Sequence, residues 1–278
     1  MDALIITLVC LAALALTLPW VFGRKKPAAA PRPMPDSWKV ILERDIPFYQ
    51  ALDPARKAEF ESRMMHFLAT TRITGVQTSV EEIDHIYIAA SAIIPIFGFP
   101  DWEYHNLHEV LLYPDAFNHD YQLAGANRSV LGMVGNGPLN NLMLLSQHEL
   151  RQAFINKTGK SNTAIHEFVH LIDQTDGSID GIPEYFLDKQ YVLPWLKLVK
   201  ESIENIEQNR SDINPYAMTN EAEFFAVAAE YFFERPELLK SKHPGLYEVM
   251  GRIFRYDDFA ALGESYGQKR NGNADDAD

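Results

Sequence analysis

Cysteine is almost absent from this chain of 278 residues, which contains only Cys10. A single cysteine excludes an intramolecular disulfide framework and any CxxC metal site, and it fits a reducing compartment. Hydrophobic residues make up 47% of the chain and charged residues 23%, which is typical of a folded globular protein. The chain is therefore expected to fold around an apolar core, for which it is long enough.

Basic residues are also scarce. The 25 Lys and Arg are outnumbered by 38 Asp and Glu, and the formal net charge is −13. Phosphate binding needs clustered Lys and Arg, so this balance argues against a nucleic-acid partner. The acidity itself identifies no partner, because it commonly serves solubility. The sequence also has no internal repeat.

One long apolar run stands at the N-terminus, from Ala3 to Phe22, broken only by Thr7 and Thr17. It matches the about 20 residues that a helix needs to cross a bilayer. The basic residues 24–26 follow at once, which favours a cytoplasmic location for the rest of the chain. We therefore predict an uncleaved transmembrane helix over residues 1–23. A cleaved signal is the alternative, because the three alanines at residues 28–30 could imitate a cleavage site; it is the weaker one, because they lie on the wrong side of the basic residues.

The remainder divides by composition. Residues 24–37 form a Pro/Ala-rich linker, and residues 267–278 form a polar, acidic tail that we expect to be disordered. Between them, residues 38–266 are predicted to be one α-rich α+β domain. Its predicted elements, taken from apolar periodicity, are helices over Pro54 to Thr70, Ile83 to Ile96 and His148 to Ile155, and short strands over Val110 to Tyr113 and Leu142 to Leu145.

The segment 165–172 reads IHEFVHLI and carries the strongest chemical signal. His166 and His170 are four residues apart, so on a helix both imidazoles leave the same face and can reach one Zn²⁺. Glu167 lies beside them and can act as the general base on the attacking water. Asn162 or Thr163 can cap the start of this helix.

Catalytic zinc needs a third protein ligand. The downstream carboxylates are Asp173, Asp176, Asp180, Glu184, Glu221, Glu223 and Glu230. Residues 219–233 predict a second helix, and a carboxylate inside its apolar sequence is costly unless it is paired. Glu223 and Glu230 are seven apart and share a face, so one could bind metal while the other supports a histidine; spacing does not choose between them. Asp173 could accept a hydrogen bond from a ligand imidazole or act as a cap.

Two segments resemble a known family. HEFVHLIDQTDG, residues 166–177, and NPYAMTNEAEFFAVAAEYFF, residues 214–233, resemble the Mlc titration factor A family of bacterial zinc metallopeptidases. Weaker matches include AASAIIPIFG at residues 89–98 and YPDAF at residues 113–117. The resemblance covers about residue 40 to about residue 260. The family is similar to the catalytic domain of anthrax lethal factor and belongs to the gluzincins, whose third zinc ligand is a glutamate.

The resemblance implies a zincin-like fold and assigns roles. His166, His170 and Glu223 would bind Zn²⁺, Glu167 would be the base, and Tyr216 would donate a hydrogen bond to the developing oxyanion. It also implies a transcriptional regulator, a repressor of glucose uptake, as a partner besides the peptide or protein substrate. Together with the N-terminal run, it predicts a single-pass protein of the bacterial inner membrane with its catalytic domain in the cytoplasm.

The sequence hypothesis is therefore a zinc-dependent peptidase. Leu142 to Leu145 could offer a strand edge to an extended peptide substrate. The alternative from another class is a membrane-tethered regulatory or binding module with a structural zinc site, in which Asp180 or Glu184 would complete four protein ligands. A zinc hydrolase acting on a non-peptide amide is a third reading.

Overall fold

The structure is a computed structural model that describes residues 33–116, 131–134 and 140–256. The predicted transmembrane helix, most of the linker and the acidic tail lie outside these residues, so those predictions stay untested. Within the described part of the chain, no helix has the length and apolar character needed to span a membrane.

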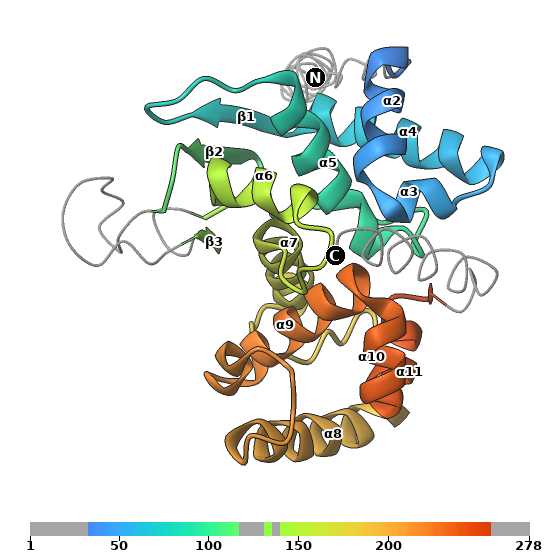
Figure 1. The fold of residues 1–278 in the computed structure, drawn as a ribbon, viewed down its shortest axis with the longest axis vertical. Helices are drawn as coiled ribbons and strands as arrows, with labels where there is room; N and C mark the ends of the chain where they lie inside the picture. The colour runs from blue at the N-terminus through green and yellow to red at the C-terminus, as the bar shows by residue number, and fades with distance from the viewer. Residues whose placement is uncertain (1–32, 117–130, 135–139, 257–278) are drawn as a thin grey trace, which may run out of the picture. The chain divides into compact units, whose positions relative to one another are not determined.

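Four strands form one sheet beside the N-terminal helices (Figure 1). They are β1 (Arg72–Gly75), β2 (Glu109–Tyr113), β3 (Gly132–Val134) and β4 (Leu142–Ser146). The strand order is β1-β2-β4-β3, with β1, β2 and β4 parallel and β3 antiparallel to β4. β4 is therefore an inner strand, and the prediction that residues 142–145 offer an edge to a substrate is wrong. Strand β3 was not predicted, because its three residues are too few to show the alternation of a strand.

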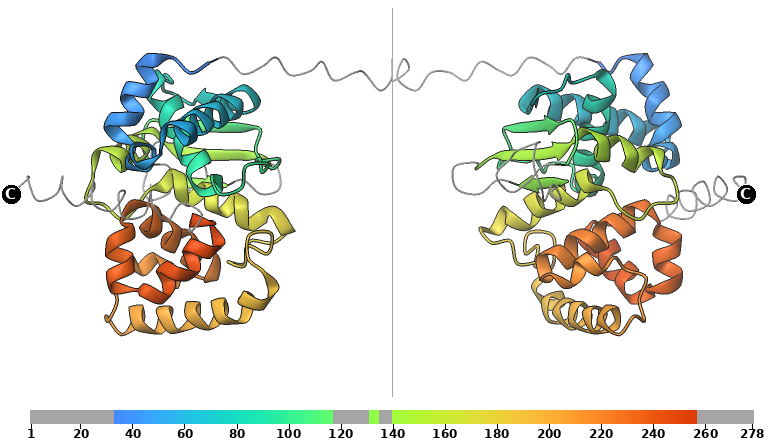
Figure 2. Two further views of the ribbon diagram at one scale, coloured as in Figure 1. Left: turned by 90° about the vertical axis from the view of Figure 1, so that its right-hand side faces the viewer. Right: turned by 60° about the vertical axis from the view of Figure 1, so that its left-hand side comes forward.

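Helices make up most of the domain and pack beside the sheet, which confirms the predicted α-rich α+β class (Figures 1 and 2). The N-terminal helices are α2 (Asp36–Asp45), α3 (Pro47–Ala51), α4 (Pro54–Thr70) and α5 (Glu82–Ile96). The later ones are α6 (Gln147–Ile155), α7 (Thr163–Asp173), α8 (Lys189–Glu207), α9 (Glu221–Glu234), α10 (Pro236–Lys242) and α11 (Pro244–Ile253). Two short 3-10 turns are η2 (Gln174–Asp176) and η3 (Pro215–Met218). The three predicted helices and two predicted strands match α4, α5, α6, β2 and β4 to within a residue at either end.

Helix α7 lies at the centre of the domain and packs against α5, α9 and β3. Its residues Ala164 to Asp173 are all buried, and Phe168 is completely so. Helix α9 is also buried along almost its whole length and contributes four phenylalanines to the core. Burial of both helices fixes their positions, and this matters because each carries part of the site.

The two faces of the sheet differ. Val110, Leu112, Met143 and Leu145 point into the main core, while Leu144 and Tyr113 form a separate small cluster on the other face. This alternation is what a sheet covered by helices on one face requires. The main-core face is the one that approaches α7, through β3.

Candidate metal centre

The two histidines of α7 project from one face of the helix. Asn162 begins the helix, and its side chain accepts a hydrogen bond of 3.1 Å from the backbone N–H of Ile165. His166 and His170 lie one turn apart, and their Nε2 atoms are 3.0 Å from each other. Both side chains are buried. The cap and the spacing thus aim two imidazole nitrogens at one point.

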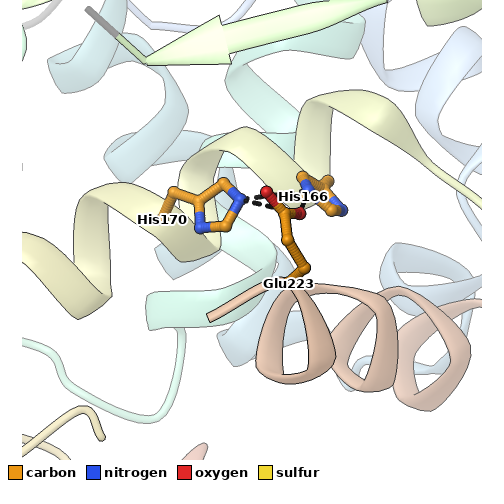
Figure 3. A group of neighbouring side chains, drawn as sticks. All are labelled: His166, His170 and Glu223. Carbon is orange, nitrogen blue, oxygen red and sulfur yellow. Dashed lines mark hydrogen bonds and ion pairs between the residues drawn. The ribbon is translucent and has the colours of Figure 1, made fainter. Parts of the chain in front are cut away.

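Helix α9 brings Glu223 to the same point (Figure 3). Asn220 caps this helix by accepting a hydrogen bond of 2.9 Å from the backbone N–H of Glu223. The Oε2 atom of Glu223 lies 2.9 Å from Nε2 of His166 and 3.4 Å from Nε2 of His170. We call these three residues the His-His-Glu cluster. Among the described residues, this is the group of His, Cys, Asp and Glu whose donor atoms come close enough to hold one metal ion.

The donor set of the cluster fits Zn²⁺. Ligands at 2.0–2.1 Å in a tetrahedral arrangement lie about 3.3 Å from one another, and the cluster separations are 2.9–3.4 Å. Nδ1 of His166 lies 2.7 Å from Oε1 of Glu230 and donates its proton there, which leaves Nε2, facing Glu223 and His170, as the nitrogen that could offer a lone pair to a metal ion. Converging lone pairs and a carboxylate are stabilised by a cation between them.

The electrostatics of the cluster also favour a cation at this position. Burial lowers the pKa of His166, but the charge of Glu230 and hydrogen bonds with Glu223 and Glu230 outweigh it and hold that pKa well above its ordinary value. Burial raises the pKa of Glu223, yet hydrogen bonds from the two histidines lower it to about 2. Both shifts mean that the surroundings favour positive charge at the cluster.

Glu167 is buried beside the cluster and is not part of it. Burial raises the pKa of its carboxyl, although the charges of His166 and His170 partly oppose this. A desolvated carboxylate next to a metal site is a stronger base than one in water. Its neighbour on the other side is strand β3, where a Cβ at Gly132 would lie 2.6 Å from its Oε1 atom.

Tyr216 stands on the exposed side of the cluster. It lies in η3, where the side chain of Asn214 accepts a hydrogen bond of 3.0 Å from its backbone N–H. Its ring centroid is 6.0 Å from that of His166, and the residue is 52% exposed. Partial burial and the charges of Glu223 and Glu167 raise the pKa of its phenol, so it carries its proton at neutral pH.

Two carboxylates from the sequence shortlist hold the helices in place. Oε2 of Glu230 accepts a hydrogen bond of 2.6 Å from the backbone N–H of Asn162, while its other oxygen meets His166. Asp173 accepts a hydrogen bond of 2.8 Å from the backbone N–H of Gly181, and no hydrogen bond joins it to His170 in the described structure. Asp180 is bound to Ile182 and Ser178 and lies outside the cluster.

The contacts that join α7 to α9, and the contact between Gly181 and α8, were not predicted from the sequence. The side-chain amide of Asn162 donates a hydrogen bond of 3.0 Å to Glu234, which adds to the bond between its backbone and Glu230. Gly181 adopts φ +77°, and its carbonyl accepts a hydrogen bond of 2.6 Å from the indole of Trp195. The sequence signal for these residues was limited to the capping potential of Asn162 and the apolar setting of the α9 carboxylates.

Two capped, buried helices that converge on two histidines and a glutamate define a class of metal-binding protein. The comparisons with known proteins narrow this class. The sequence model of the glucose-regulated metallo-peptidases M90 matches residues 20–255, and the chain belongs to that family. The resemblance proposed from the motifs is thereby confirmed at the level of the family.

Individual relatives are similar over most of their length. The Mlc titration factor A of Pectobacterium atrosepticum is 25% identical over 242 residues, which cover 82% of this chain and 88% of that protein. The Mlc titration factor A of Salmonella gallinarum is 28% identical over 229 residues, with 76% and 83% covered. An uncharacterized protein of Synechocystis is 27% identical over 256 residues, with 84% and 89% covered.

Proposed function

We propose that the protein is a zinc-dependent peptidase in which His166, His170 and Glu223 bind the metal. The observation that carries the proposal is the convergence of Nε2, Nε2 and Oε2 within 3.4 Å of one another from two buried helices. Zn²⁺ bound there would polarise the scissile carbonyl and make a water molecule acidic. Membership of a metallo-peptidase family supports the same reaction class.

The protein's own side chains then divide the work. Glu167 takes the proton from the attacking water and later delivers it to the leaving amine. Burial raises the pKa of its carboxyl, which makes the carboxylate a stronger base toward the attacking water than one in free solution. Tyr216 keeps its phenolic proton and donates a hydrogen bond to the oxygen that becomes negative in the transition state.

An open coordination position separates this proposal from a structural zinc site. A structural site closes four protein ligands around the metal, whereas a catalytic site uses three. In the part of the chain that the structure describes, the cluster has three members. Asp180, one suggested fourth ligand, has both carboxylate oxygens engaged within its own loop. These observations favour catalysis over the structural alternative.

The remaining parts of the proposal concern the surroundings of the enzyme. The apolar run at residues 3–22 would hold the catalytic domain at the cytoplasmic face of a bacterial inner membrane. Relatives are named for titration of Mlc, and a transcriptional regulator of that kind is our proposed protein partner beside the peptide substrate.

The proposal is tested with Glu167→Gln. This variant keeps the size of the side chain and removes the base, so zinc content should stay at about one per chain while cleavage of a mixed peptide library falls by a factor of about 10² to 10⁴. Glu221→Gln, an exposed change on the first turn of α9, is the matched control and should cleave like wild type. Undiminished cleavage by Glu167→Gln would refute the role of the base.

A further inference from the structure

Gly132 occupies a special position on strand β3. Side chains alternate along a strand, and Met133 packs with Leu144 on the outer face while Val134 belongs to the main core. Position 132 therefore shares a face with Val134 and is directed toward α7, against which β3 packs. A residue with a side chain would place it between the strand and the helix.

There is no room for such a side chain. A Cβ at position 132 would lie 2.6 Å from Oε1 of Glu167, 2.7 Å from its Cγ and 2.7 Å from Cγ2 of Thr163. Non-bonded carbon atoms pack at about 3.5–4.0 Å. A methyl group here must displace the strand, the helix or the Glu167 side chain.

The strand and the helix are both anchored. Gly132 pairs with Leu145 in the antiparallel ladder, and the backbone N–H of Ser146 donates a hydrogen bond of 2.9 Å to Leu131. The start of α7 is held by Asn162, which bonds to Glu230 and Glu234. The side chains in the contact are then the parts left to move, and Glu167, which supplies two of the three close atoms, has more χ angles with which to turn away than Thr163 has.

We propose that Gly132 is a positioning residue for Glu167. The bare backbone of β3 lies directly against the carboxylate and Cγ of Glu167 and keeps water from that side. The carboxylate is thereby oriented toward the reacting water beside the cluster. The inference deepens the peptidase proposal and rests on its role for Glu167. In this proposal the short edge strand β3 helps to align Glu167, the general base.

The kinetic test uses Gly132→Ala in the full-length chain loaded with zinc. A displaced base slows the proton transfer and leaves the three metal ligands in place. We expect kcat on a fluorogenic peptide to fall about 10- to 100-fold, with KM within about twofold of wild type and zinc content unchanged. Gly245→Ala is the matched control, because its Cβ would meet nothing closer than 4.0 Å. A kcat for Gly132→Ala equal to that of the control would overturn the proposal.

A second arm needs no turnover. Gly132→Ala should lower the melting temperature by about 4 °C or more through overpacking. In a Glu167→Ala background the Cγ and Oε1 contacts are gone, so the same change should cost about half as much or less. Equal losses in both backgrounds would show that Glu167 is not the group displaced and would also overturn the proposal.

The two arms distinguish the two proposals. If wild-type protein cleaves no peptide while the melting temperatures show the coupling, the peptidase proposal fails and the contact between Gly132 and Glu167 stands. If wild type cleaves peptides and the coupling is absent, the peptidase proposal stands and the positioning role of Gly132 fails.

Discussion

Glu230 contacts both a histidine of the candidate metal centre and the start of α7. One of its oxygens lies 2.7 Å from Nδ1 of His166, and the other accepts a hydrogen bond of 2.6 Å from the backbone of Asn162. It therefore fixes the tautomer and ring orientation of His166 at the same time as it ties α9 to the start of α7. Carboxylates that orient a metal-binding imidazole in this way raise its basicity.

Replacement of this carboxylate should weaken the metal site without removing a ligand. An amide in Glu230→Gln cannot accept from both the His166 ring and the Asn162 N–H, so one buried donor faces another donor. We expect zinc affinity to fall about 10- to 100-fold, measured by competition with a chromogenic chelator. Glu221→Gln should bind zinc like wild type, and an affinity for Glu230→Gln equal to that control would contradict the account.

The choice between Glu223 and Glu230 marks the limit of the sequence at this scale. Seven-residue spacing places both on one face of a helix. Which of them meets the Nε2 atoms depends on how α9 crosses α7, and that crossing is set by tertiary packing. The structure places Glu223 at both Nε2 atoms and Glu230 at Nδ1 of His166. From the sequence, only the family resemblance favours Glu223 over Glu230 as the ligand.

At the scale of elements, the segment between α7 and α8 connects α7 and α9, the two helices that carry the His-His-Glu cluster. Asp173 at the end of α7 binds the N–H of Gly181, Trp195 of α8 binds its carbonyl, and the first residue of α9 lies against it. A Cβ at Gly181 would lie 2.4 Å from the carbonyl oxygen of Glu221, and φ is +77°. A glycine is required there on both counts.

Gly181→Ala should disturb both folding and metal binding. The left-handed backbone and the contact with Glu221 together should cost about 2–4 kcal/mol of unfolding free energy. A shifted α9 also weakens zinc binding, so the loss should be larger with zinc than without it. Chemical denaturation of both forms measures this, with Gly245→Ala as control. Equal losses with and without zinc would show that Gly181 does not align the metal helices.

Some elements could be predicted from the sequence and others could not. The cap at Asn162 and the apolar periodicity of α4 and α5 are local signals, and the structure follows them. The strands β1 and β3 have four and three residues, too few for alternation to stand out. The place of β4 inside the sheet depends on pairing with β3, which no local pattern indicates.

At the scale of the whole molecule, α7 links the sheet to the C-terminal helices (Figure 2). The proposed site draws Glu167 and the two histidines from α7, Glu223 and Glu230 from α9, and Gly132 from the sheet. The family match over residues 20–255 spans all of these parts. The fold class followed from helical periodicity, whereas the assembly of the site from segments far apart in the chain is a product of packing.

The central claim is that one zinc ion in the His-His-Glu cluster makes the protein a peptidase. The most direct measurement titrates the chelator-stripped, full-length chain with zinc while following cleavage of a mixed peptide library. The account predicts that cleavage is absent at the start, rises in proportion to added zinc and levels off at about one zinc per chain. Cleavage that persists without zinc, or one tightly bound zinc per chain without cleavage of any peptide, would contradict it.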